Sequence, residues 1–183
     1  MPSKTRRGGQ PMQERPQNHE VPDYEKPYVG AVPDGDLLAI LEGQQADMLG
    51  LLDTLAEEQL EFRYAPGKWS IRQVIGHVAD NERILAYRLL RFARGDATEL
   101  PGYDENLLVA EGPFTSWTRA QAAADYSAVR QATLTLLRGL RPEDWQREGV
   151  ANGLRHSVLL LACVIAGHEK HHLNILRERY LRE

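Results

Sequence analysis

Residues 158–180 read VLLLACVIAGHEKHHLNILRERY, and this stretch decides the fold. Its first ten residues are apolar on nearly every side, so a helix formed here has to be buried by several neighbours at once. Ser157 stands directly before it as a candidate N-cap, and the helical pattern runs to about Tyr180. The stretch therefore predicts a central helix that other helices surround.

Three upstream segments show the three-or-four spacing of apolar residues that predicts helices. Their apolar positions are Leu37, Leu41, Met48, Leu52 and Leu55, then Ile71, Val74, Val78, Leu85, Leu89 and Phe92, then Ala122, Tyr126, Val129, Ala132, Leu136 and Leu140. Their candidate caps are Asp34 or Asp36, then Ser70 with Gln73 as a capping box, then Thr115 or Ser116. No convincing strand pattern lies between these segments. The sequence therefore predicts an all-α fold, a four-helix bundle, with a long connection over residues 96–114.

The N-terminal part of the chain has a different composition. Residues 1–33 hold six of the ten prolines and show no helical or strand period, so we expect a flexible, Pro-rich tail followed by one domain over residues 34–183. The part from Tyr24 to Val32 contains tyrosines and valines, and it is a candidate for an extended arm that lies against the domain.

Charge and composition exclude several classes of protein. The 183 residues carry 22 Lys and Arg against 26 Asp and Glu, a net charge of −4, which does not fit a dedicated nucleic-acid binder. The one cysteine, Cys163, excludes an intramolecular disulfide and is expected to be a buried core residue. No segment resembles an export signal or is long enough to span a membrane, so we expect a cytoplasmic protein without membrane contact.

The histidines of the last helix raise a functional question. His168 and His172 differ by about 40° around the helix axis and share one face, whereas His171 is rotated by about 60° to the other side. Each of the pair is either a hydrogen-bonded core residue or a metal ligand, and one ion would satisfy both imidazoles. His77, about two turns into the second helix, is the candidate for a third ligand. His19 and His156 have no spacing argument and are expected at the surface.

Two motifs resemble those of a known family. The stretch YAPGKWSIRQVIGHVADNER over residues 64–83 resembles the second-helix motif of the DinB/YfiT-like metalloprotein superfamily, and AGHEKHHLNILR over residues 166–177 resembles its closing-helix motif. The likeness covers roughly residues 36–181. It implies a four-helix bundle that holds one divalent ion through His77, His168 and His172, and a homodimer. Members of known activity use the metal to activate a low-molecular-weight thiol, and others are described as hydrolases.

Three histidines around one ion would leave a position for water or substrate. Zn²⁺ is the first expectation for this ion, with Ni²⁺ and Fe²⁺ as alternatives. Bound water gives hydrolysis of a small-molecule substrate, and a bound thiol gives thiol transfer. Asp80 and Asn81, one turn beyond His77, are candidates to orient a ligand or a bound water, although Asp80 fits a solvated carboxylate equally well.

Other residues near the two motifs receive simpler interpretations. Glu82 and Glu169 are expected to be salt-bridging surface residues, and Tyr103 and Asp104 are candidates to roof the site. Two functions remain open: a metal-dependent enzyme of the transferase or hydrolase type, and a non-catalytic module that binds a metal or a small molecule.

Overall fold

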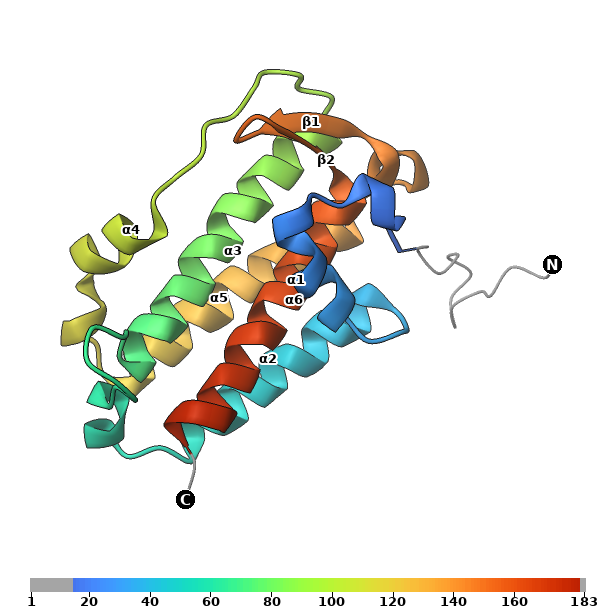
Figure 1. Cartoon of the computed structure of the whole chain (residues 1–183). Helices are drawn as coiled ribbons and strands as arrows, with labels where there is room; N and C mark the ends of the chain where they lie inside the picture. The colour runs from blue at the N-terminus through green and yellow to red at the C-terminus, as the bar shows by residue number, and fades with distance from the viewer. Residues whose placement is uncertain (1–14, 182–183) are drawn as a thin grey trace.

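The computed structural model describes residues 15–181, which form a bundle of four long helices. These are α2 (Leu37–Asp53), α3 (Ile71–Ala93), α5 (Arg119–Arg138) and α6 (Val158–Ile175), and α6 continues into one π-helical turn (Leu176–Tyr180) (Figure 1). The four-helix bundle predicted from the sequence is confirmed. No helix among these residues is both long and apolar enough to cross a membrane.

Side-chain caps fix where the helices begin. The carboxylate of Asp36 accepts a hydrogen bond from the backbone N–H of Ala39, and Ser70 forms the expected capping box with Gln73. Ser157 caps α6 in the same way. The third long helix begins later than expected, because Thr118, rather than Thr115 or Ser116, supplies the cap.

The order of the helices in space differs from their order in the chain. The main contacts join α3 to α5 and α6, and α2 to α5 and α6, so the consecutive helices α2 and α3 lie diagonally across the bundle. The connection from α3 back to the start of α5 runs along the outside of the bundle and includes α4 (Glu105–Glu111) and a 3-10 turn (Pro113–Ser116) (Figure 1). Because of this crossover, α3 and α5 run in the same direction as neighbours.

Apolar residues form two separate clusters, one at each end of the bundle. On every long helix a buried polar side chain falls between the two clusters, and these residues are Gln44, Glu82, Arg130 and Glu169. The bundle is therefore crossed at mid-height by a polar layer, which we define by these four residues. Since buried polar groups are costly unless they are paired, their partners matter.

Arg130 pairs with groups from the three other long helices. Its guanidinium donates to both carboxylate oxygens of Glu82 on α3 (2.9 and 2.6 Å), to the carboxylate of Glu169 on α6, and to the backbone carbonyl of Leu41 on α2 (2.9 Å). Glu169 also accepts from the hydroxyl of Tyr126 (2.6 Å). The expectation that Glu82 and Glu169 lie at the surface is wrong, because both are buried around this one cation.

A β-hairpin that the sequence analysis missed closes one end of the bundle. β1 (Glu148–Ala151) pairs antiparallel with β2 (Leu154–Ser157) through a two-residue turn in which Asn152 (φ 53°) and Gly153 (φ 71°) both have positive φ. Such a turn suits Asn-Gly and matches the twist of the paired strands. The strands are too short to give a pattern that sequence periodicity detects.

The described segment before α2, from residue 15 on, packs on the bundle. It contains two 3-10 turns (Asn18–Glu20 and Asp23–Glu25) and a short helix, α1 (Lys26–Ala31), which lies along α6 (Figure 1). The expected extended arm is therefore a short helix, and residues 15–33 form turns and a helix where no regular structure was expected. Residues 1–14 of that expected tail lie outside the described residues.

Removing the central guanidinium would leave two buried carboxylates without their counter-charge. We expect Arg130→Met to lower the free energy of unfolding by about 3–5 kcal/mol, the cost of breaking a buried ion pair by removing one partner. The matched control is Arg138→Met, since Arg138 pairs with Glu42 at half-exposed positions and should change stability by about 0–1 kcal/mol. Urea denaturation measures both, and equal losses would contradict a central role for Arg130.

Candidate metal centre

Three imidazoles meet beside the polar layer. His77 comes from α3, and His168 and His172 come from successive turns of α6. The Nε2 atom of His168 lies 3.0 Å from that of His77 and 3.2 Å from that of His172. The structure thus brings together the three histidines that the sequence analysis singled out, with their ring nitrogens all within 4.8 Å of one another.

The spacing of these nitrogens suits a single metal ion. Ligand nitrogens at about 2.0–2.1 Å from a tetrahedral Zn²⁺ stand about 3.3 Å apart. The distances of 3.0 and 3.2 Å come close to this value. Hydrogen bonding alone does not account for the cluster, because the Nε2 atom of His168 either donates one hydrogen bond or accepts one and so cannot serve both neighbours.

Burial keeps these imidazoles neutral, which is the form that binds metal. It lowers the pKa of His77 to about 4. Burial, followed by the neighbouring His77 and His171, lowers the pKa of His172 to about 3, and His168 also has a pKa well below its usual value for the same main reason. At neutral pH each ring therefore has one nitrogen free to donate a lone pair to an ion.

Aromatic rings enclose the histidines. The indole of Trp69 lies 4.7 Å from the ring of His77, centroid to centroid, and Tyr28 on α1 presents its edge to His168 at 5.5 Å. His171 is exposed and turns towards Tyr28 at 5.4 Å, away from the converging nitrogens. Its position agrees with the angular argument from the sequence.

A hollow of about 170 Å³ opens beside His168, and we call it the His168 hollow. Its charged lining residues are Glu25, Arg88 and Glu105, and Tyr24, Tyr28, Asn81 and Tyr103 also line it. The hydroxyl of Tyr103 donates to the side-chain oxygen of Asn81. Burial raises the pKa of Tyr103 to about 12, so the hydroxyl keeps its proton at neutral pH and can act as this donor.

A second hollow, the His172 hollow, lies on the other side of the histidines. It has a volume of about 240 Å³, and its lining includes Tyr64, Lys68, Trp69 and Asn106. The histidine cluster is therefore flanked by two cavities, one beside His168 and one beside His172.

The structure separates the two candidates for orienting groups. Asn81 is buried and lines the His168 hollow, whereas Asp80 accepts a hydrogen bond from Arg83 (3.0 Å), which also pairs with Asp125 on α5. Burial raises the pKa of Asp80. Because the hydrogen bond of Asp80 is directed to Arg83 and not to the histidines, Asn81 is the better placed of the two for a role at the site.

Other expectations had mixed outcomes. Tyr103 lines the His168 hollow as expected, but Asp104 caps α4 through the N–H groups of Asn106 and Leu107. Cys163 is buried in the core as expected.

His156 is not at the surface. It is 1% exposed and bonded to Glu25, while His19 is exposed as expected.

Several residues that line the His168 hollow were missed in the sequence analysis. Tyr24, Glu25 and Tyr28 lie in the expected tail, and Arg88 was one of several cations on its helix. The aromatic residues of the tail were the one available signal.

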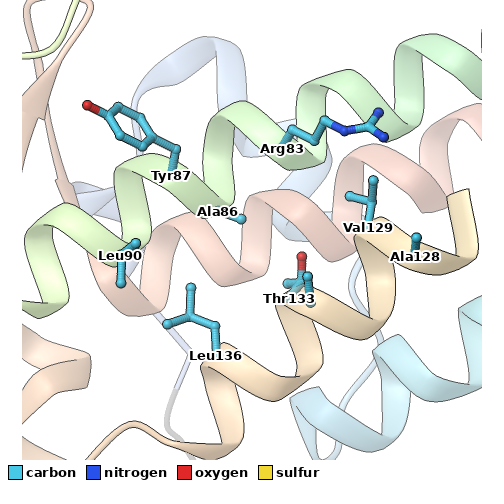
Figure 2. A pocket seen from close by; sticks show the side chains of 9 residues that line it. Arg83, Ala86, Tyr87, Leu90, Ala128, Val129, Thr133 and Leu136 are labelled. Atoms are coloured by element: carbon cyan, nitrogen blue, oxygen red, sulfur yellow. The ribbon is translucent and has the colours of Figure 1, made fainter. Parts of the chain in front are cut away.

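A larger groove of about 470 Å³ lies between α3 and α5 and contains none of the histidines. Figure 2 shows Leu90 on α3 pointing towards Leu136 on α5 across this groove, with Val129 further along α5. Its lining is mostly apolar, without a cluster of groups that could perform chemistry, so the histidine cluster is the candidate functional site.

Comparisons with known proteins place the chain in a family. The family model described as the DinB superfamily matches residues 40–176. Two curated relatives carry the name "Putative metal-dependent hydrolase". The one from Oceanobacillus iheyensis is 26% identical over 124 residues, which cover 67% of this chain and 70% of the relative. The one from Bacillus pumilus is 29% identical over 127 residues, which cover 68% and 71%.

A solved structure shows the same fold. YfiT from Bacillus subtilis, described as "a probable metal-dependent hydrolase with an unusual four-helix bundle topology", aligns over 91% of both chains with a TM-score of 0.68 and 18% identity.

Replacing individual histidines tests which of them hold the ion. We expect His168→Ala and His172→Ala to abolish stoichiometric metal binding, because each removes one of three converging nitrogens. His171→Ala is the matched control on the same helix and should bind metal within a few-fold of the parent. Elemental analysis and competition with a chelator measure this, and equal metal loss in the control would contradict the assignment.

The lowered pKa values also predict a pH dependence of stability. The unfolded state binds more protons than the metal-free folded state between pH 6.5, the ordinary histidine pKa, and about pH 4, the pKa of folded His77. The free energy of unfolding should therefore fall on acidification through this window, by on the order of 3 kcal/mol for His77 alone.

Denaturation of the chelator-treated protein at a series of pH values measures this fall. His77→Gln should make it smaller, and an unchanged pH profile in that variant would contradict the burial of a neutral His77.

Proposed function

We propose that this chain, which belongs to the DinB superfamily, is an enzyme in which a divalent ion held by His77, His168 and His172 activates a nucleophile. The observation that carries the proposal is the convergence of three neutral ring nitrogens beside an open hollow. A purely structural site is usually closed by four protein ligands, whereas three ligands leave a position for reaction. Zn²⁺ fits this donor set, and Ni²⁺ or Fe²⁺ are the alternatives.

When bound, the ion supplies Lewis acidity and lowers the pKa of a water or a thiol. Residues of the chain exclude water from the site and orient the substrate. Trp69 and Tyr28 limit the access of bulk water to the imidazoles, which strengthens electrostatic interactions at the site. Tyr103 fixes the oxygen of Asn81 by its hydrogen bond, so the amide N–H groups of Asn81 are the donors left to orient a substrate in the His168 hollow.

Hydrolysis of a small molecule is the first form of this proposal. The names of both curated relatives support it. A hydrolase needs one organic substrate beside the ion, and the His168 hollow offers room for one.

Thiol transfer is the second form, and a specific observation favours it. The histidine cluster has two hollows beside it, and a transferase has to bind two molecules, the thiol and its acceptor.

The proposal also includes a homodimer. The mass of the protein in solution tests this.

The test begins with removal of the metal by a chelator and reconstitution with Zn²⁺, Ni²⁺ or Fe²⁺. Each form is assayed against a panel of chromogenic esters and amides for hydrolysis, and against cysteine with an electrophilic dye for thiol transfer. We expect activity only in a metal-loaded form, and its loss to background in His77→Ala. His171→Ala is the control that should stay active. A protein that binds metal stoichiometrically but is inactive in both assays would support the non-catalytic module instead.

A further inference from the structure

Part of the lining of the His168 hollow comes from the segment ahead of the family match. Tyr24, Glu25 and Tyr28 all precede residue 40, where the match begins. This segment approaches α6 very closely at Gly167, where a side-chain Cβ would lie 2.0 Å from the backbone oxygen of Tyr28. Glycine is therefore required at this point for α1 to close the hollow.

Glu25 lines the hollow and has one carboxylate oxygen without a partner. The residue is 3% exposed, its Oε1 atom accepts a hydrogen bond from the hydroxyl of Tyr24 (2.9 Å), and the same atom lies 3.1 Å from Nε2 of His156. Its Oε2 atom is buried and has no hydrogen-bond partner among the described residues. Leaving a buried acceptor unsatisfied costs about 1–3 kcal/mol, and more when the group is charged.

His156 keeps this carboxylate in place. Its Nδ1 atom lies 3.0 Å from the backbone oxygen of Leu154, and its Nε2 atom lies 3.1 Å from Glu25. These two contacts tie the imidazole to β2 and to the Oε1 side of the Glu25 carboxylate, and Glu25 itself lines the hollow.

Arg88 brings unused donors to the same hollow. Only 6% of the residue is exposed, and its guanidinium lies over the ring of Tyr103, 5.6 Å from the centroid. Among residues 15–181 it makes one hydrogen bond, from Nη2 to the backbone oxygen of Pro101 (2.8 Å), and has no carboxylate within salt-bridge distance. Guanidinium offers five N–H donors in a planar fork that matches a carboxylate, so most of its capacity is free.

We infer that the His168 hollow binds a small zwitterion, an α-amino acid or a molecule that ends in one. Its ammonium group lies against Oε2 of Glu25 and its carboxylate against the guanidinium of Arg88. The charged lining of the cavity, Glu25 and Glu105 together with Arg88, is complementary to a ligand with both charges, whereas a simple amine or a simple acid matches one sign only. The volume of about 170 Å³ fits a group of this size.

This inference rests on the proposed function only in placing the rest of the ligand beside the ion. Since His168 lines the same hollow, the side chain of the amino acid would point to the metal. Glu25 and Arg88 would then act as residues that determine which substrate is accepted.

Three matched probes test the inference on the full chain: L-2-aminobutyrate, butyrate, which lacks the amine, and 1-propylamine, which lacks the carboxylate. Ligand-observed NMR titration measures their affinities. We expect aminobutyrate to bind about tenfold more tightly than either analogue, the gain of one charge-assisted contact. An amino acid can also chelate a metal ion, so the titration is repeated on chelator-treated protein, where the binding should persist.

Variants assign each charge to its partner. Glu25→Gln should weaken aminobutyrate and propylamine by about tenfold and leave butyrate unchanged, and Arg88→Met should weaken aminobutyrate and butyrate instead. Glu148→Gln, which alters a surface ion pair with Arg155, is the matched control. If Glu25→Gln fails to fold, Gly167→Ala replaces it, since the added methyl group displaces α1 and should abolish binding of aminobutyrate.

The outcomes separate this inference from the proposed function. Equal affinities for the three probes, or binding of aminobutyrate that disappears with the metal, would overturn the zwitterion site even if the protein is an active metalloenzyme. Aminobutyrate binding that depends on Glu25 and Arg88 in a protein without activity would support the site and reject the proposed function.

Discussion

The bundle depends on one buried cation. The guanidinium of Arg130, on α5, donates hydrogen bonds to a carboxylate on α3, a carboxylate on α6 and a backbone carbonyl on α2. All four long helices therefore meet at this side chain. An arrangement of this kind contributes little net stability, because the desolvation of three charges offsets much of their attraction. Its effect is on geometry. Helices that touch only through apolar side chains could slide along one another, whereas a planar guanidinium reaches its hydrogen-bond acceptors in one register only.

The histidine cluster benefits from that register. Both glutamates that pair with Arg130 share a helix with a histidine of the cluster. Glu169 directly follows His168 on α6, and Glu82 lies on α3 with His77. The contacts of Arg130 with these glutamates therefore set the rotation and the height of α3 and α6 relative to each other. Three converging nitrogens need such a fixed relation, since a shift of an ångström would spoil the geometry of a metal site.

Sequence reasoning succeeded where the signal is local. A capping box, an apolar stripe and an i,i+4 pair of histidines are each contained in one helix, and His77 was proposed from its place on the second helix, with the family motif in agreement. It failed where the partner is distant in the chain. Glu82 looks like any charged helical residue until Arg130, 48 positions away, is placed beside it, and His156 is buried because Glu25 meets it across 131 positions. The hairpin was missed because its Asn152-Gly153 turn joins strands of four residues each.

The crossover between α3 and α5 has a consequence for how the chain acquires its structure. Because α2 and α3 lie diagonally across the bundle, α2 does not pack on the next long helix in the chain, and its parallel partner α6 is the last of the four long helices in the sequence. Contacts between segments so far apart in the chain slow folding relative to a simple up-and-down bundle, since the loop between them must be closed first. A nascent chain that ends before α6 exposes the apolar faces of three helices, and exposed apolar surface of this kind favours aggregation until α6 is available to cover it.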